Sequence, residues 1–255
     1  MKLAVSGKGG VGKTTIAAGL VQSFANTHKL VYAIDGDPDA CLAAALGIPE
    51  DTANRLKPIA EMKELINSRG GSGSFYLLNP KVDDVPEQYA YRLGNIRFLR
   101  MGEVKKGGAD CYCRENTFLQ ALIASLLLDR GEVVIMDMGA GIEHLSRGTA
   151  RGVDLMLVVV EPNRNSINTA RNVIKMAADL GIKKTRVVGN KIRFDREREF
   201  ITGSFQPGEL LELIKFNEDV WGSALGPADA AKAGKNFASE IETLREKILL
   251  ELDEN

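Results

Sequence analysis

The sequence predicts an α/β fold, in which a mostly parallel, twisted sheet is flanked by helices within a single domain spanning residues 1–255. The first observation behind this prediction is that short apolar runs alternate with longer helical patterns, as in βαβ units. The second is a hydrophobic content of 44% over 255 residues, which is enough to bury one sizeable core. Residues 48–104 are too many for one crossover, so we expect this segment to make an excursion from the sheet.

Each expected strand is a short apolar run bounded by glycine or polar residues. The strands are expected at residues 2–6, 30–34, 96–100, 133–136, 155–160, 186–190 and 210–214. The helices are expected at residues 13–27, 59–68, 115–129, 166–180 and 236–252. For the helix at 166–180, residues 163–166 form a start signal and Gly181 a stop signal.

Composition restricts the classes of partner. The 33 Lys and Arg residues balance 34 Asp and Glu residues, which leaves a net charge of -1 and no basic field for nucleic acid or anionic lipid. The longest apolar run, around residues 155–160, falls far short of the roughly 20 residues that span a bilayer. The first residues lead straight into a strand rather than a signal peptide, and the cysteine count of three is odd. We therefore expect a cytoplasmic protein that binds neither nucleic acid nor membrane.

A glycine-rich segment directly follows the first expected strand. The run from Gly7 to Thr14 fits G-x-x-x-x-G-K-[ST], whose backbone N–H groups surround a β-phosphate. Lys13 would neutralise β- and γ-phosphate oxygens, and the Thr14 hydroxyl would bind Mg²⁺. A chance match is disfavoured because a strand precedes the loop and a helix follows it. The sequence thus predicts a P-loop NTPase that binds ATP or ADP through Gly7, Lys8, Gly9, Gly10, Val11, Gly12, Lys13, Thr14 and Thr15.

Lys8 is not needed in a plain P-loop. With this lysine the sequence resembles the deviant-Walker, dimeric branch of P-loop ATPases, which includes the partitioning, Min-type and nitrogenase-iron-protein families. The resemblance implies that Lys8 reaches the phosphates bound by the opposing subunit. ATP would then lie between two chains, and its hydrolysis would require a homodimer. The alternative is a solvated loop lysine.

Two carboxylates would complete the catalytic machinery. The resemblance implies that Asp37, in the D-P dipeptide after the second strand, orients the attacking water or holds a water on Mg²⁺, and so acts with Lys8 and Lys13. Asp137 ends an apolar strand in the manner of a Walker B motif and would serve Mg²⁺. Residues 138–141 resemble the second switch of this branch. The neighbouring Asp35 and Asp39 have structural alternatives, as the end of a strand and the start of a helix.

The choice of base follows from hydrogen-bonding capacity. Guanine-specific NTPases accept the guanine N–H groups with the aspartate of Asn-Lys-x-Asp. In this sequence Asn190 and Lys191 are followed at the corresponding position by Arg193, which has no acceptor, so ATP is favoured. Asn190 matches the family position that contacts adenine. The alternative is a structural asparagine in a turn.

The pair Cys111 and Cys113 is a candidate transition-metal site. In an extended segment, residues i and i+2 face the same side, so two thiolates can bind one ion. Two thiolates do not complete a four-coordinate site, but a second copy of the chain would supply two more. The alternative is a buried structural pair. Cys41 is expected to lie on an alanine-rich helix and to be a small core residue.

Taken together, these motifs are similar to those of the CooC-type accessory ATPases, which assist nickel insertion into carbon monoxide dehydrogenase. The resemblance implies a homodimer that binds Ni²⁺ or Zn²⁺ through Cys111 and Cys113 of both subunits and delivers the metal to the carbon monoxide dehydrogenase apo-enzyme. It extends over about the first 200 residues and is looser beyond, where residues 213–217 lack the usual proline. The segments of this sequence that carry the resemblance are GKGGVGKTT at 7–15, DGDPD at 35–39, GADCYCREN at 108–116 and DMGAGIEHL at 137–145.

Three alternative functions compete with this interpretation. A Min-type or partitioning ATPase that binds membranes needs a C-terminal helix with a basic face, but the helix at 236–252 has an acidic polar face, and we expect its apolar stripe to pack in the core. A reductase like the nitrogenase iron protein needs a cysteine in the second switch, and residues 137–141 contain none. An ATPase that matures the nickel site of acetyl-CoA synthase remains open, because the motifs do not specify the client.

Overall fold

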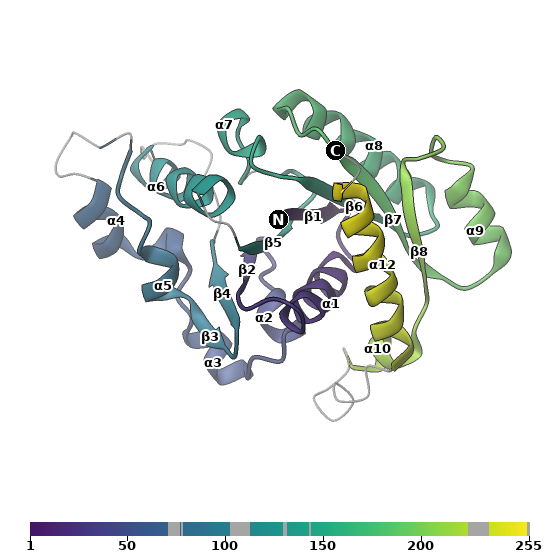
Figure 1. Ribbon diagram of the computed structural model, residues 1–255, viewed down its shortest axis with the longest axis horizontal. Helices are drawn as coiled ribbons and strands as arrows, with labels where there is room; N and C mark the ends of the chain where they lie inside the picture. Colours follow the sequence, from purple (N-terminus) through teal and green to yellow (C-terminus); the bar gives the residue numbers. More distant parts are fainter. Residues whose placement is uncertain are drawn as a thin grey trace.

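The computed structural model describes residues 1–70, 77, 79–102, 113–129, 132–142, 144–223 and 235–253 (Figure 1). The strands are β1 (Lys2–Gly7), β2 (Val31–Gly36), β3 (Tyr91–Leu93), β4 (Ile96–Arg100), β5 (Val133–Met138), β6 (Leu155–Val160), β7 (Thr185–Ile192) and β8 (Leu210–Lys215). The longer helices are α1 (Lys13–Ala25), α4 (Lys63–Gly70), α6 (Cys113–Ala124), α8 (Arg164–Leu180), α9 (Asp195–Thr202) and α12 (Lys235–Asp253). The shorter ones are α2 (Leu42–Ala45), α3 (Glu50–Arg55), α5 (Val85–Tyr89), α7 (Arg147–Ala150) and α10 (Glu218–Ser223).

In the described part of the chain, one twisted sheet of eight strands organises the fold. Its strand order is β3-β4-β2-β5-β1-β6-β7-β8, and all neighbouring strands are parallel except β3 and β4. The prediction of a mostly parallel sheet flanked by helices is therefore confirmed, and so are the seven expected strands. The additional strand, β3, is a three-residue partner of β4 across a turn in which Gly94 has a φ of 58°. Central strands β1 and β5 are buried along their whole length, as parallel strands covered on both faces should be.

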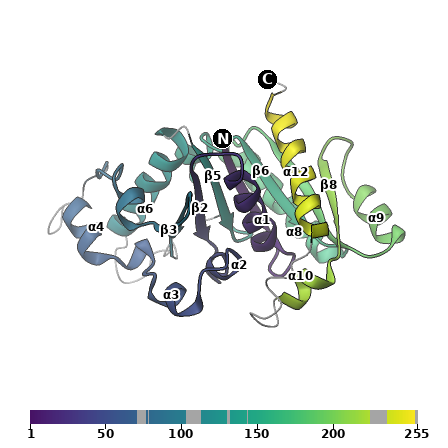
Figure 2. The same cartoon turned by 60° about the horizontal axis from the view of Figure 1, so that its bottom comes forward.

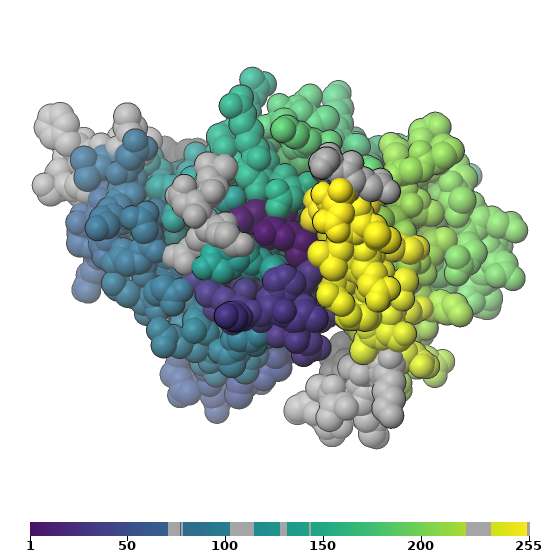
Figure 3. Space-filling model, viewed as in Figure 1, coloured from purple at the N-terminus to yellow at the C-terminus, as the bar shows by residue number. Residues whose placement is uncertain are grey.

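Helices cover both faces of the sheet. Helices α1 and α12 lie side by side on one face, whereas α6 and α8 cover the other (Figures 1 and 2). The apolar stripe of α12 is buried against α1, which confirms the prediction that it packs in the core; its buried members are Ile241, Leu244 and Ile248. In the space-filling view α12 forms a ridge beside the N-terminal segment (Figure 3).

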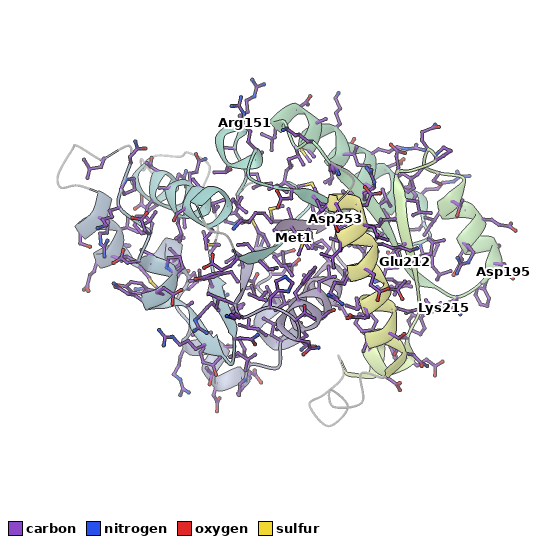
Figure 4. All side chains as sticks on the ribbon, viewed as in Figure 1. Met1, Arg151, Asp195, Glu212, Lys215 and Asp253 are labelled. Atoms are coloured by element: carbon purple, nitrogen blue, oxygen red, sulfur yellow. The ribbon has the colours of Figure 1, made fainter. Side chains whose placement is uncertain are left out.

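Helix α12 also contacts the edge strand β8. The Lys247 ammonium lies 2.9 Å from a Glu212 carboxylate oxygen, and the backbone N–H of Lys215 donates to Glu240 at 3.2 Å. Glu212 and Lys215 accordingly lie beside α12 (Figure 4). The Lys247 and Glu240 side chains of α12 thus pair with polar groups of the edge strand that would otherwise face solvent.

The expected excursion between β2 and β4 is present, and it contains α2, α3, α4, α5 and β3. Two helix predictions needed adjustment. The helix expected at 59–68 is a 3₁₀ turn (Ile59–Glu61) followed by α4, because Met62 leaves the helical region with a ψ of 67°. The helix expected at 115–129 ends as a π-helical turn (Ser125–Asp129), where the buried Lys2 ammonium donates to the Leu126 carbonyl at 2.9 Å.

Within the described ranges, no helix combines the length and apolar character that crossing a bilayer requires.

Candidate nucleotide site

The P-loop connects β1 to α1 at the carboxyl edge of the sheet. Gly10 and Gly12 have φ values of 83° and 95°, in the left-handed region that glycine adopts without strain. At Gly7, an added Cβ would lie 2.4 Å from the Val159 carbonyl oxygen of β6, so only glycine fits. A Cβ at Gly9 or Gly10 would meet nothing within 4 Å, which leaves the outer side of the loop open to a ligand. Val11 is fully buried and anchors the loop, while Lys8, Thr14 and Thr15 are partly exposed.

Lys13 and Asp37, two of the three predicted catalytic residues, form an ion pair. The Lys13 Nζ lies 3.0 Å from Asp37 Oδ2, and the two side chains are only 8% and 10% exposed. The other oxygen of Asp37 accepts a hydrogen bond from the Asp39 N–H at 3.1 Å. Lys13 lies at the start of α1 and Asp37 follows β2, so the sheet edge brings them together across 24 residues of sequence. In this conformation the Asp37 carboxylate, rather than a phosphate group, neutralises the Lys13 ammonium.

Asp137 is fully buried near the end of β5. Within the described part of the chain, neither of its carboxylate oxygens accepts a hydrogen bond of ordinary geometry. Burial raises the pKa of Asp137 to about 6, although the nearby Thr14 hydroxyl and Lys13 ammonium oppose this rise. A buried carboxylate with unused acceptors next to a threonine hydroxyl fits a hydrated Mg²⁺ ion. The predicted Mg²⁺ residues Thr14 and Asp137 are therefore adjacent.

Asp35 is the register neighbour of Asp137 on β2. Its Oδ2 accepts the N–H of Leu42 at 3.2 Å, at the first residue of α2. Burial, followed by the charge of Asp137, raises the pKa of Asp35 to about 7. Asp35 thus links the end of β2 to the start of α2, across the loop that carries Asp37. Asp39 does not begin the following helix, because α2 starts only at Leu42.

The expectation that Cys41 is a core residue is wrong. Cys41 is exposed, and its thiol donates to the Asp39 carbonyl at 3.4 Å. Burial of part of the thiol, and then the nearby Asp35, raise its pKa. The reason is that Cys41 precedes α2, whose buried face is formed by Leu42 and Ala43.

The loops after β2 and β5 touch each other. The Ser6 hydroxyl donates to the Gly139 carbonyl at 2.9 Å, which ties β1 to the predicted second switch. The buried His144 ring packs on Gly36, where an added Cβ would lie 2.9 Å from its Cδ2. Sequence reasoning missed Ser6 and His144. Ser6 belongs to no recognisable spacing, and only its position directly before the P-loop could have drawn attention to it. His144 lies within the motif at 137–145, but the motif itself assigns the ring no role.

Asn190 lies beside the P-loop. It is buried, and its Nδ2 donates to the Val11 carbonyl at 2.9 Å. The next residue, Lys191, donates from Nζ to the Gly10 carbonyl. The predicted adenine contact of Asn190 stays a prediction.

An open cavity of about 1000 Å³ lies at the carboxyl ends of β7 and β8. The Arg193 guanidinium lies 4.0 Å over the ring of Phe216, and the nearby Trp221 is 59% exposed. A flat aromatic base could stack on such planar groups. The lining residues are Ile192, Arg193, Lys215, Phe216, Glu218, Trp221 and Gly222.

The predicted transition-metal site falls mostly outside the described residues. Cys111 lies outside them, and Cys113 is the first residue of α6 with its side chain undescribed. The metal site therefore stays a prediction.

Comparison with known proteins agrees with this geometry. The family model described as the CobQ/CobB/MinD/ParA nucleotide binding domain matches residues 2–225. The carbon monoxide dehydrogenase accessory protein CooC of Rhodospirillum rubrum is 41% identical over 235 residues, which cover 91% of this chain and 88% of that protein. An uncharacterized ATP-binding protein of Methanocaldococcus jannaschii is 40% identical, covering 86% and 87%. Among solved structures, the MinC:MinD cell division protein complex of Aquifex aeolicus has a TM-score of 0.67 at 19% identity, covering 97% of this chain and 95% of that chain; it shows the shared fold.

Proposed function

This chain belongs to the CobQ/CobB/MinD/ParA family of nucleotide-binding domains and, within it, to the CooC-type ATPases, and from this premise we propose that its ATP hydrolysis drives nickel delivery to a carbon monoxide dehydrogenase apo-enzyme. The observation that carries the proposal is the similarity to the Rhodospirillum accessory protein over nearly the full length of both chains. The P-loop geometry supports the ATPase part, and the two cysteines at 111 and 113 support the metal part.

The nucleotide would bind with its β-phosphate in the P-loop. Lys13 would exchange its ion pair with Asp37 for β- and γ-phosphate oxygens, and Thr14 and Asp137 would hold Mg²⁺. The exchange releases Asp37, which is then available to orient the attacking water. One carboxylate thus serves as the counter-ion of Lys13 before ATP binds and as a catalytic group afterwards.

The adenine would lie in the cavity beyond β7. The Nδ2 of Asn190 is committed to Val11, so Oδ1 is the atom that we expect to accept a hydrogen bond from the adenine amino group. Arg193 brings only donors to this cavity and stacks on Phe216. At this position the chain therefore lacks the acceptor that guanine-specific NTPases offer to the guanine N–H groups.

Two copies of the chain would close on the nucleotides. We expect Lys8 of each copy to reach the phosphates bound by the other, and Cys111 and Cys113 of both copies to form a four-thiolate site for Ni²⁺ or Zn²⁺. ATP binding would change the distance between the two cysteine pairs. Such coupling has to be reciprocal, so the metal must also change the affinity for ATP.

A membrane-positioning role is the less favoured candidate. That role would use the C-terminal helix, but the apolar stripe of α12 is buried against α1. Releasing this stripe onto a bilayer would expose the core.

The test is metal content per dimer, measured with and without ATP. The double variant Cys111→Ser, Cys113→Ser should bind ADP normally but lose the bound nickel. The matched control is Cys41→Ser, because Cys41 is an exposed cysteine that lies outside the motif. Unchanged nickel stoichiometry in the double variant, or equal loss in the control, would contradict the proposed metal site.

A further inference from the structure

Two consecutive residues of β7 bind two consecutive carbonyls of the P-loop. Asn190 Nδ2 donates to the Val11 carbonyl at 2.9 Å, and Lys191 Nζ donates to the Gly10 carbonyl at 2.5 Å. These contacts join positions about 180 residues apart in the sequence. They attach the loop to the sheet on the side that carries its carbonyl groups.

The geometry of the peptide bond gives these contacts a consequence. Within one planar trans peptide, the C=O and the following N–H point in opposite directions. Fixing the Gly10 carbonyl therefore fixes the direction of the Val11 N–H, and fixing the Val11 carbonyl fixes that of the Gly12 N–H. The Val11 N–H indeed points across the loop, toward the Lys8 carbonyl at 3.4 Å. So long a bond is readily exchanged for a phosphate oxygen.

We propose that Asn190 and Lys191 are positioning residues that orient the phosphate-binding N–H groups of Val11 and Gly12 before the nucleotide arrives. Preorganised donors bind an anion without first having to be ordered, so the affinity for phosphate rises. This inference deepens the proposed nucleotide site and rests on it. It needs neither the dimer nor the transition metal.

Lys191 is itself held in place. Its Nζ lies 3.4 Å from Glu161 Oε2 at the end of β6, and Glu161 Oε1 accepts from Asn163 Nδ2 at 2.8 Å, next to the start of α8. The backbone of Lys191 is in the left-handed region, with a φ of 61°, which is costly for a lysine. On the P-loop side of these contacts, position 12 requires glycine, because a Cβ there would lie 2.4 Å from Asn190 Nδ2.

The test separates phosphate binding from base binding. Calorimetric affinities for adenosine, ADP and ATP are measured on the full chain with Mg²⁺ and without nickel. We expect Lys191→Met to weaken ADP and ATP by the same factor, about tenfold, because one charge-assisted hydrogen bond is lost. Adenosine affinity should not change. Steady-state KM for ATP should rise by a similar factor, with kcat within about threefold of its original value.

Four further variants define the outcome. Lys191→Arg, which keeps a cation and its donors, should recover most of the ADP affinity. Lys191→Gly removes the backbone strain together with the side chain, and should be as weak as Lys191→Met if the side chain is what matters. For Asn190→Ala, ADP affinity should fall further than adenosine affinity. Lys175→Met on the exposed face of α8 is the matched control and should behave like the unaltered chain.

Three results would overturn the proposal. The first is unchanged ADP affinity in Lys191→Met and Asn190→Ala. The second is full ADP affinity in Lys191→Gly, which would assign the effect to the backbone. The third is a much larger loss for ATP than for ADP, which would place the Lys191 charge directly on the γ-phosphate. If Lys191→Met does not fold, Lys191→Gly and Asn190→Ala still decide the matter. Loss of nickel binding would contradict only the proposed metal function, because ADP binding requires no nickel.

Discussion

At the residue scale, the buried carboxylates beside the P-loop favour ligand binding at the expense of stability. Asp137 is fully buried, and no described side chain or backbone group gives either oxygen a hydrogen bond of ordinary geometry. A buried acceptor without a partner destabilises the fold, and a buried charge does so more strongly. Such a group persists where a ligand completes its environment.

We therefore expect Asp137→Asn to stabilise the nucleotide-free protein. Removing the uncompensated charge should raise the free energy of unfolding at pH 8 by about 1–3 kcal/mol. For a chain of this size, that corresponds to roughly 2–4 °C in Tm for each kcal/mol. Thermal melts with a chelator measure the gain, and melts with Mg²⁺ and ATP should show that ligand stabilisation is lost. A variant that melts lower in the absence of ligand would contradict the assignment.

The same carboxylates predict how stability depends on pH. Burial raises the pKa of Asp137 to about 6 and that of Asp35 to about 7, from an ordinary value of 3.8. The folded chain therefore retains protons that the unfolded chain has released, and without Mg²⁺ its free energy of unfolding should fall as pH rises from about 4 to about 7. Stabilisation by Mg²⁺ and ADP should increase over the upper part of this range, because metal binding needs the ionised form of Asp137.

Urea denaturation between pH 5 and pH 8, with chelator or with Mg²⁺ and ADP, measures both slopes. Because Asp35 and Asp137 are neighbours, they titrate as a pair, and Asp137→Asn should flatten the chelator profile. A chelator profile that rises with pH would contradict the prediction.

Asp37 is expected to contribute to catalysis more than to binding. In Asp37→Asn, Lys13 no longer has a carboxylate that competes with the phosphates, so affinity for ATP should stay the same or increase. Turnover should fall at least about 100-fold, because the group that orients the attacking water is lost. Calorimetry and phosphate release give the two quantities separately. Weaker affinity with unchanged turnover at saturating ATP would show instead that Asp37 serves binding alone.

At the element scale, the contact between α1 and α12 depends on a glycine. An added Cβ at Gly19 would lie 2.9 Å from Ile241 Cγ1, so the two helices are close because this position has no side chain. We expect Gly19→Val to reduce the free energy of unfolding by about 1–3 kcal/mol through overpacking. Adding Ile241→Ala should recover part of that loss.

The matched control for this contact is Gly222→Ala. Gly222 lies in α10, and a Cβ there meets nothing within 4 Å, so this change should be neutral or slightly stabilising. Denaturant unfolding is measured for five proteins: the unaltered chain, Gly19→Val, Ile241→Ala, the double variant and Gly222→Ala. Strictly additive effects of the Gly19 and Ile241 changes would contradict a direct contact.

Elements with a clear local pattern were predictable from the sequence. The central strands β1, β2, β5 and β6 were the clearest, because each is a mostly apolar run that is buried along its whole length in a sheet covered on both faces. The strand β3 was missed because three residues that pair only with β4 carry too little pattern. In the π-helical turn after α6, the Leu126 carbonyl accepts a hydrogen bond from the buried Lys2, more than 120 residues away, and no local rule predicts such a contact.

The site was predictable where function requires a fixed spacing along the chain. The P-loop, Asp37 and Asp137 follow this rule, and the structure brings Lys13 to Asp37 and Thr14 to Asp137. The contacts of Asn190 and Lys191 with the P-loop were not predictable, since they depend on β7 being placed two strands from β1 in the sheet. The exposure of Cys41 depends on where α2 begins, which is an error of a few residues in an element boundary.

At the scale of the whole molecule, the proposed function requires two sources of dimer stability that can be separated. ATP should join two chains through Lys8, and the transition metal should join them through Cys111 and Cys113. Lys8→Ala should therefore abolish ATP-dependent dimerisation and turnover, while the monomer keeps its fold and its affinity for ADP. The double cysteine variant should show the reverse: it should dimerise with ATP but not with nickel.

Sedimentation equilibrium of both variants, with a non-hydrolysable ATP analogue, nickel, both or neither, gives the mass in each state. In the unaltered protein the factor by which the analogue tightens nickel binding must equal the factor by which nickel tightens analogue binding. A coupling of 1–3 kcal/mol corresponds to a factor of about 5–150. If the protein stays monomeric with both ligands present, Lys8 cannot reach a second nucleotide, and two cysteines cannot complete a four-coordinate metal site. If it dimerises but the two factors are both close to one, nucleotide and metal bind independently, and ATP hydrolysis cannot drive metal transfer through this site.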